Sequence, residues 1–322
     1  MPDADASSHV LVMLQEAVAL LKVRPGGFYV DATVGAGGHA AAIAEQLDGQ
    51  GHLLALDRDP FAVSLAAKRL ENFPNVRVMR GNYRELERWL DMIGWTGIDG
   101  LLIDAGVSSM QIDTPDRGFS VQADGPLDMR MDPDQPMSAR HLLAGISETS
   151  LEKILRDFGD VKMAKRIARR ILHARDHGHL ASTGDLARAV REALPFVSSG
   201  VPDEVRQVFQ AIRIAVNDEL GALEACLESA VSRLKPGGRI VAIAFHSGED
   251  RVIKRIFRKY ARPRVEREPD GRTRRVWHPI LREITDSPLR PSSDEVSVNP
   301  RSASARMRAA EKLPETQGEN RS

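Results

Sequence analysis

The chain has 322 residues, of which 42% are hydrophobic and 28% charged, and it contains a single cysteine, Cys226. This composition is ordinary for a globular protein of one large or two modest domains, and one cysteine excludes an intramolecular disulfide and any cysteine-rich metal site. The apolar stretch 10–21 is too short to span a bilayer and no basic segment precedes it, so we expect a cytoplasmic protein.

The formal net charge is zero, but the basic residues are concentrated in two segments. Residues 251–290 contain 13 Lys or Arg against 5 Asp or Glu, and residues 153–175 contain 8 against 2. Such clusters are typical of phosphate binding, whereas a charge run is more commonly a solvated helix face. Two clusters in a neutral protein favour a nucleic-acid partner.

The first part of the chain alternates predicted helices and strands, after a polar segment, 1–8, that we expect to be disordered. Apolar periodicity and turn residues predict helices at 9–23, 39–47, 60–70 and 85–93 and strands at 28–31, 51–57, 76–80 and 98–104. This alternation predicts an α/β fold with a mostly parallel sheet that is covered on both faces.

Strand signals disappear between residues 138 and 211, where helices are predicted at 147–158, 162–174 and 183–193. Further elements then follow, with helices at 208–220, 222–234 and 251–260 and strands at 239–244 and 306–310. We therefore predict an α/β domain in two parts, 1–137 and 212–313, a helical insertion at 138–211 that binds substrate, and a disordered tail, 314–322.

A turn of small residues follows the first predicted strand. Its glycines, Gly35, Gly37 and Gly38, allow close approach of a ligand to the backbone, but their spacing is not that of dinucleotide binders and is weak by itself. Asp57 ends the next strand, about twenty residues further on, where a carboxylate can bind ribose hydroxyls. The alternative is a solvated aspartate, with Asp59 as the better helix cap. Together the loop and the acid predict an adenosine-containing cofactor.

Two more residues are expected at the same edge of the sheet. Tyr83 could stack on adenine or pack in the core, and Asp104 ends the fourth strand, where ligands of such sheets bind. The long segment 113–136 mixes Arg, Asp and aromatic residues, as a substrate-binding loop would. Its aspartates could bind Mg²⁺, but aspartate is also a common turn residue, so we predict no metal.

Several sequence blocks together resemble one family, the bacterial 16S ribosomal RNA cytosine N(4)-methyltransferases. The blocks are DATVGAGGH (31–39), DRDP (57–60), DAGVSSMQID (104–113), RGFS (117–120), GPLDMRMD (125–132), FQAIRIAVNDEL (209–220), FHSGEDR (245–251) and NPRSASARMR (299–308). The chain departs from the usual family pattern at Ala105, Met110 and Gly248. The resemblance implies a class I, Rossmann-like S-adenosylmethionine-dependent methyltransferase that methylates the exocyclic N4 amine of a decoding-centre cytidine in 16S rRNA of the small ribosomal subunit.

The same resemblance implies roles for individual residues. The residues expected to bind the cofactor lie in the glycine loop and at or after the strand ends: Gly35, Gly37, Gly38, His39, Asp57, Tyr83, Asp104 and Gln111. The chemistry of the transfer, in which an acceptor group orients the poorly nucleophilic amine, makes Asp104 the first candidate for that role, followed by Asn217, His246 and Asp128. Asp104 as a cofactor ligand alone and His246 as a structural residue remain open. Candidate RNA-binding residues are Arg117, Arg130, Arg166, Arg169, Arg251 and Arg255.

The lone cysteine bears on the acceptor atom. Methylation at cytosine carbon 5 generally needs a cysteine nucleophile, whereas Cys226 lies in an amphipathic helix far in sequence from the predicted site. N-methylation is therefore favoured. Two other classes remain as alternatives: an NAD-dependent oxidoreductase and a non-catalytic RNA-binding or ribosome-assembly protein. A homodimer stays open as well.

Overall fold

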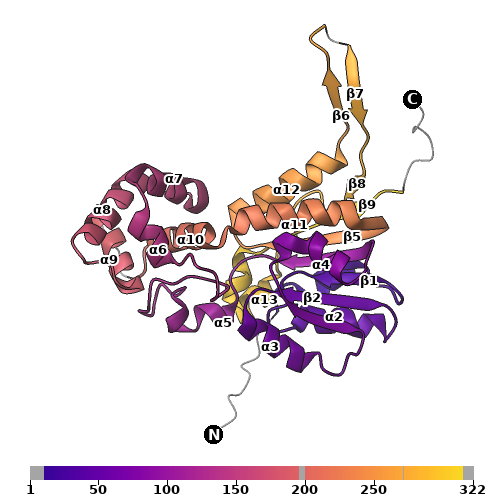
Figure 1. Ribbon diagram of the computed structural model, residues 1–322, viewed down its shortest axis with the longest axis horizontal. Coiled ribbons are helices and arrows are strands. Elements are labelled where there is room, and N and C mark those ends of the chain that lie inside the picture. Colours follow the sequence, from indigo (N-terminus) through magenta and orange to yellow (C-terminus); the bar gives the residue numbers. More distant parts are fainter. Residues whose placement is uncertain (1–10, 196–199, 271, 315–322) are drawn as a thin grey trace. The chain divides into compact units, whose positions relative to one another are not determined.

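The computed structural model describes residues 11–195, 200–270 and 272–314, and the chain forms two compact units (Figure 1). Unit 1 comprises the described residues of Met1–Gly106 and Leu220–Ser322, and unit 2 comprises those of Val107–Glu219. The helical insertion predicted at 138–211 lies within unit 2. Two segments, 1–8 and 314–322, were expected to be disordered. Apart from residue 314, they lie outside the described residues.

Unit 1 is built on a seven-stranded sheet in the order β3-β2-β1-β4-β5-β9-β8. Strands β1 to β5 are parallel, whereas β9 is antiparallel to β5 and β8 is antiparallel to β9. Their bounds are β1 Phe28–Asp31, β2 His52–Asp57, β3 Val76–Arg80, β4 Ile98–Asp104, β5 Leu234–Ala244, β8 Leu281–Glu283 and β9 Arg306–Lys312. The predicted mostly parallel, Rossmann-like sheet is confirmed.

Helices cover both faces of this sheet because successive side chains of a strand point to opposite faces. On β2, Leu53 and Ala55 pack in a core cluster with helices α1 (Leu14–Leu21), α2 (Gly38–Leu47) and α3 (Pro60–Arg69). Leu54 and Leu56 pack in a second cluster, with α4 (Leu86–Met92), α11 (Glu219–Arg233) and α12 (Ser247–Ala261). Asp59 caps α3 as predicted, since its Oδ1 accepts a hydrogen bond from the Phe61 N–H.

Strand β5 contains a turn-like sequence that the prediction placed before the strand. Ile98 of β4 pairs with Leu234, and Gly100 pairs with Arg239, so residues 235–238 form an irregularity between two registers. Gly237 has a φ of 76° there, which a residue with a side chain rarely adopts. The predicted strand at 239–244 is therefore the regular part of a longer strand.

Unit 2 is helical and has its own core. Its helices are α5 (Ser109–Ile112), α6 (Ala139–Gly145), α7 (Glu148–Gly159), α8 (Ala164–Asp176), α9 (Thr183–Ala193) and α10 (Asp203–Asn217). A short 3₁₀ segment lies at Pro115–Arg117 in unit 2, and two more lie at Tyr83–Glu85 and Pro300–Ser304 in unit 1. The sequence analysis missed α5 and α6 in unit 2. In unit 1 it missed β8, α13 (Ser293–Val298) and the hairpin of β6 (Arg264–Arg267) and β7 (Thr273–Trp277), which projects from α12 in Figure 1.

Candidate active site

Three aspartates end neighbouring strands of unit 1. Asp31 ends β1, Asp57 ends β2 and Asp104 ends β4, and the order β2-β1-β4 sets these strands side by side. In a parallel sheet of this kind, ligands bind outside the carboxyl ends of the strands. We call this part of unit 1, with the start of α12, the reaction edge.

The glycine loop between β1 and α2 adopts a shape that side chains would obstruct. Gly37 has a φ of 82°, and a Cβ atom there would lie 3.3 Å from the Ala66 Cα atom. A Cβ atom on Gly38 would lie 2.3 Å from the Leu11 side chain. Gly35 has a φ of 52°, but a Cβ atom there would meet only the Thr33 carbonyl oxygen, 4.0 Å away. The loop is thus closely packed at Gly37 and Gly38, whereas there is room for a ligand at Gly35.

His39 is buried at the start of α2. Its Nε2 atom lies 3.2 Å from the Val12 carbonyl oxygen, to which it donates a hydrogen bond. Burial lowers the pKa of this imidazole to about 4, so the ring is neutral at physiological pH. The side chain therefore fastens the N-terminal segment to α2, while the first N–H groups of that helix are the kind that bind anionic ligand groups.

Asp57 joins the glycine loop to the strand beside it. Its Oδ2 atom accepts a hydrogen bond from the Gly35 N–H at 3.0 Å, and its Oδ1 atom accepts one from the Asp59 N–H at 2.9 Å. Burial raises the pKa of this carboxyl group, against the lowering effect of the two N–H donors. Each carboxylate oxygen keeps acceptor capacity, so the group can still bind a vicinal diol.

Tyr83 lies in the 3₁₀ segment after β3 and is largely buried in a core cluster of unit 1. The Arg58 guanidinium carbon lies 6.0 Å from the centre of its ring. The structure thus gives Tyr83 the packing role that was one of its two predicted roles. Its predicted contact with adenine stays a prediction.

Buried carboxylates with unused oxygen atoms mark the centre of the reaction edge. Asp31 is 1% exposed, and its Oδ1 atom accepts a hydrogen bond from the Thr33 N–H at 3.1 Å. Within the described part of the chain, Asp31 Oδ2 and Asp104 Oδ1 are buried and have no hydrogen-bond partner. Because an unpaired buried acceptor is costly, these two atoms indicate a ligand with N–H or O–H groups.

The pKa values of these carboxyl groups reflect the same burial. Burial raises the pKa of Asp31 to about 7, against the effect of the Thr33 N–H donor. Burial raises the pKa of Asp104 well above its ordinary value, and the negative charges of Asp31 and Glu249 raise it further. A carboxylate of raised pKa is a stronger proton acceptor, and such values are typical of functional sites.

His246 caps α12 at the reaction edge. Its Nδ1 atom accepts hydrogen bonds from the Gly248 N–H at 3.1 Å and the Glu249 N–H at 3.4 Å, which places the ring proton on Nε2. That Nε2 atom lies 3.2 Å from Glu249 Oε1. The Nδ1 lone pair is therefore used by the helix, which supports the structural role, whereas the buried Nε2 atom has no hydrogen-bond partner among the described residues. The catalytic role of His246 stays a prediction.

The remaining candidates from the predicted catalytic and cofactor sets lie in unit 2. The Gln111 Oε1 atom accepts a hydrogen bond from the Ser108 N–H in a capping box of α5. The Asn217 amide donates to the Met129 and Arg213 carbonyl oxygens and accepts from the Met131 N–H. Asn217 is thus engaged in holding residues 129–131. The cofactor role of Gln111 stays a prediction.

Two candidate RNA-binding arginines of unit 2 are also engaged within that unit. Arg117 Nη2 donates hydrogen bonds to the Arg130 and Met131 carbonyl oxygens, each at 3.0 Å. Arg130 forms a two-point ion pair with Asp128, at 2.7 and 2.8 Å. The Asp128 carboxylate therefore has an arginine partner, whose charge and hydrogen bonds lower the pKa of that carboxyl group against the effect of burial. These contacts stiffen segment 117–131.

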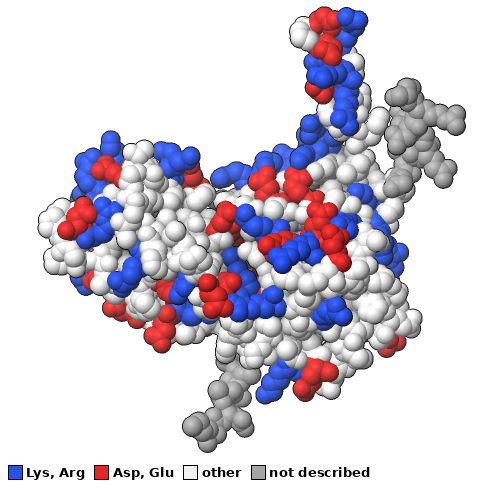
Figure 2. All heavy atoms as spheres, in the orientation of Figure 1, with Lys and Arg blue, Asp and Glu red and all other residues white. Residues whose placement is uncertain are grey.

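The candidate cations on helices differ in their partners. Arg169 pairs with Glu148 and Arg255 pairs with Glu224, whereas Arg166 and Arg251 have no ion pair or hydrogen bond within the described residues. Figure 2 shows Lys and Arg side chains gathered along α12 and its hairpin and on the helices of unit 2. Exposed cations remain available in both basic segments that the sequence singled out.

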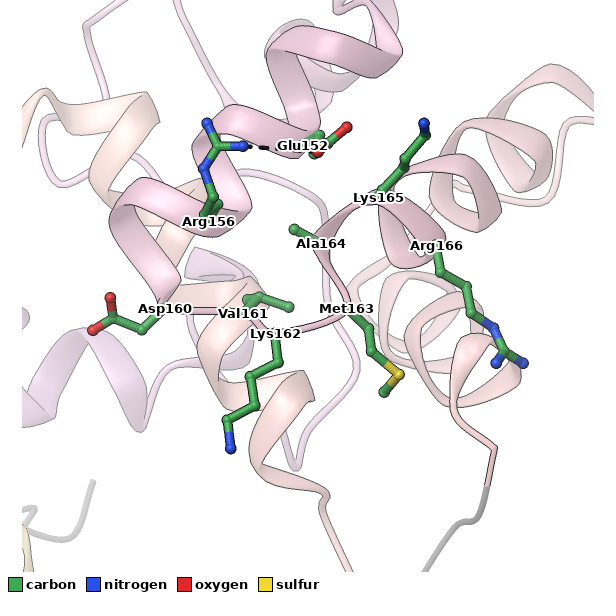
Figure 3. A pocket seen from close by; sticks show the side chains of 9 residues that line it. All are labelled: Glu152, Arg156, Asp160, Val161, Lys162, Met163, Ala164, Lys165 and Arg166. Atoms are coloured by element: carbon green, nitrogen blue, oxygen red, sulfur yellow. Dashed lines mark ion pairs between the residues drawn. The ribbon is translucent and has the colours of Figure 1, made fainter.

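A shallow depression in unit 2 has a volume of about 540 Å³ and lies at the start of α8. Figure 3 shows Arg156 turned toward Glu152, with which it forms an ion pair, whereas Lys162, Lys165 and Arg166 point in different directions. These three cations do not converge on a common point. They belong to the predicted RNA-binding surface rather than to a defined pocket.

The sequence analysis missed Asp31 and Glu249 as members of the site. Asp31 was noted only as the end of a strand, and Glu249 stood only in the block FHSGEDR, before the helix predicted at 251–260. Glu249 is 1% exposed, and its Oε2 atom accepts hydrogen bonds from the Phe245 and His246 N–H groups. Its place at the carboxyl end of β5 is the only local signal that could have identified it.

A family model described as the MraW methylase family matches residues 6–313 of the chain. The chain belongs to the MraW methylase family. It is 46% identical to the ribosomal RNA small subunit methyltransferase H of Methylococcus capsulatus, with 93% of this chain and 99% of that protein covered. It is 44% identical to the proteins of the same name from Heliobacterium modesticaldum (95% and 98% covered) and Geobacter sulfurreducens (95% and 99% covered).

Membership in a methylase family decides against the oxidoreductase alternative, and the cofactor is S-adenosylmethionine. The reaction edge fits this group: Asp57 retains acceptor capacity for a ribose diol, and the loop at Gly35 is open where a ligand would approach. When bound, the cofactor supplies an electrophilic methyl group on a sulfonium.

Three further observations concern other classes of site. Cys226 is fully buried in the core of unit 1, and burial raises the pKa of its thiol to about 12, so its predicted packing as a small apolar residue is confirmed. Among the described residues, no group of three or more His, Cys, Asp or Glu side chains could hold a metal ion. None of the helices in the described ranges combines the length and the apolar character needed to cross a membrane.

Proposed function

We propose that this MraW-family methylase transfers the methyl group of S-adenosylmethionine to the exocyclic N4 amine of a decoding-centre cytidine in 16S rRNA of the small ribosomal subunit. It would act in the cytoplasm and need no metal ion. The family and the names of its relatives support a ribosomal RNA substrate. The observation that carries the acceptor assignment is the buried, unpaired Asp104 Oδ1 atom at the reaction edge.

Cytosine's amine is a poor nucleophile because its lone pair is conjugated with the ring. Asp104 would accept a hydrogen bond from one amine N–H and hold the nitrogen in line for attack. Methylation would place positive charge on this nitrogen, and Asp104 would take up the proton that the nitrogen then loses. The raised pKa of Asp104 favours this transfer.

Other residues of unit 1 would hold the cofactor. Asp57 would accept hydrogen bonds from the ribose hydroxyls, and Tyr83 would flank the adenine. The loop Gly35–Gly38 and the first N–H groups of α2 would lie against the methionine part. The inert Cys226 thiol supports attack by the base's own amine, since methylation at carbon 5 needs an exposed, ionisable thiol.

The test uses small ribosomal subunits from cells that lack the protein, incubated with the protein and methyl-labelled S-adenosylmethionine. Nuclease digestion and mass analysis then locate the label. We expect one labelled cytidine, with the label on the amino nitrogen. Label on a ring carbon would overturn the acceptor assignment. Cofactor binding without transfer to any RNA would favour a non-catalytic RNA-binding or assembly protein.

A further inference from the structure

Helix α12 connects the reaction edge to the rest of the basic segment. It follows β5, and its capping residue His246 and buried Glu249 lie at that edge, where the charge of Glu249 raises the pKa of Asp104. The helix is 15 residues long and therefore extends about 22 Å away from the site. Whatever binds along α12 thus begins next to the proposed target base.

The two sides of α12 have different chemistry. Val252, Ile253, Ile256 and Phe257 are buried and pack on the sheet. Exposed or half-buried cations lie on the other side at Arg251, Lys254 and Arg258. Spacings of three and four residues place these three on one face of the helix, over about 10 Å of its length.

These three cations differ from their neighbours on the same helix. Arg255 forms an ion pair with Glu224 and Lys259 forms one with Glu228, both glutamates being on α11. In the described chain, Arg251, Lys254 and Arg258 have no ion pair and no hydrogen bond. Glutamates of α11 therefore neutralise the row of Arg255 and Lys259. The adjacent row on α12 has no acidic partner among the described residues, and we call it the uncompensated row.

The uncompensated row continues into the hairpin. Arg264 begins β6, and both Arg264 and Arg275 lie over the Trp277 ring, with guanidinium carbons 4.7 and 4.9 Å from the ring centre. The ring thus holds two cations in place instead of presenting a clear face for a base. Figure 2 shows basic side chains that follow α12 and continue along the hairpin.

We propose that Arg251, Lys254 and Arg258, continued by Arg264, form a phosphate track that holds the RNA backbone next to the target nucleotide and leads it from the reaction edge to the hairpin. This inference rests on the proposed function, because it takes the bound base to be part of an RNA chain. The phosphates that flank a base at the reaction edge must lie near it, and unpaired cations are their natural partners. An acidic protein would match the charge but would not explain why the row starts at the reaction edge.

The experiment compares two variants of the full-length protein that each lose three positive charges. The track variant carries Arg251→Gln, Lys254→Gln and Arg258→Gln. The control carries Lys22→Gln, Lys68→Gln and Arg77→Gln, three exposed cations elsewhere in unit 1. Binding to 16S rRNA and to small subunits from cells lacking the protein is measured at several salt concentrations. Binding of S-adenosylmethionine and methyl transfer to the subunits are measured separately.

We expect the track variant to bind RNA at least about 10-fold more weakly and its log–log salt slope to fall by about 2, since each lost phosphate contact removes about 0.7 for a single strand. Its cofactor affinity should equal that of the wild type, which shows that unit 1 is folded. The control should keep the wild-type slope. Equal slopes for the track variant and the wild type, with methyl transfer intact, would overturn the track alone. Failure of the wild type to bind or methylate the RNA would overturn the proposed function as well.

Discussion

The polar groups of the reaction edge and those around segment 117–131 in unit 2 differ in their hydrogen-bond partners. In unit 2, the Asn217 amide makes three hydrogen bonds to the backbone, and Arg117 and Arg130 are bound to carbonyl oxygens or to Asp128. At the reaction edge, Asp31 and Asp104 each keep a buried oxygen without a partner among the described residues. Satisfied groups stabilise their surroundings, whereas unsatisfied ones lower stability unless a ligand pairs with them. Partners, rather than residue type, thus separate structural from catalytic candidates.

The largest effect is expected at Asp104. Asp104→Ala removes the proposed proton acceptor, so methyl transfer to small subunits in a single turnover should fall by about 10² to 10⁴-fold. The free energy of unfolding should not decrease, because the lost carboxylate had an unpaired buried oxygen. Asp104→Asn, which retains one acceptor oxygen but cannot take the proton, should also lose most activity. Transfer within a few-fold of the wild type would contradict the role of Asp104.

The next largest effect is expected at Asn217, whose amide has hydrogen-bond partners within unit 2. Asn217→Ala leaves the Met131 N–H and the Met129 and Arg213 carbonyl oxygens without their partner. We expect a loss of about 2–4 kcal/mol in the free energy of unfolding, measured by urea denaturation. Affinity for S-adenosylmethionine should persist in conditions where the variant is folded. Unchanged stability together with lost methyl transfer would instead support the catalytic role that the sequence predicted for Asn217.

The effect that is smallest for each step of the measurement is a pH dependence at Asp31. Its pKa is about 7 in the folded protein and 3.8 ordinarily, so between these values the folded state holds a proton that the unfolded state has lost. The contribution of Asp31 to stability therefore falls as pH rises from about 4 to 7, by at most about 1.4 kcal/mol per pH unit. The Asp31→Asn variant should lack this slope. Above pH 7 its free energy of unfolding should exceed that of the wild type. Parallel stability curves for the two cofactor-free proteins, measured by denaturation across this range, would contradict the burial of a titrating Asp31.

Much of unit 1 could be predicted from the sequence because its signals are local. Apolar runs that end in an acid gave β2 and β4, and the small-residue loop gave the turn into α2. The hairpin was missed because four of the five residues of β7 are exposed, so no alternation of buried and exposed side chains marks it. Helix α6 and strand β8 have only seven and three residues, too few to show a period.

The candidate site was predictable in its residue types but not in its partners. Asp57 and Asp104 stood out because each follows a strand, and a strand end is visible in the sequence. The engagement of Asn217 with residues 129–131 joins positions more than 80 residues apart, and no local pattern encodes it. Likewise, the sequence of α12 does not say which of its cations meet a glutamate of α11.

The insertion of unit 2 between β4 and β5 has a consequence for the order of folding. These two strands are parallel neighbours near the middle of the sheet, and their pairing must close a loop that contains all residues between Asp104 and Leu234. The entropic cost grows with loop length, by about 0.6 kcal/mol for each doubling of a flexible loop. Helices α7, α8 and α9 pack on their neighbours in the chain, and such local contacts form early. We therefore expect unit 2 to collapse first and shorten the loop, so that Asp104 and Glu249 meet only in the last step of assembly.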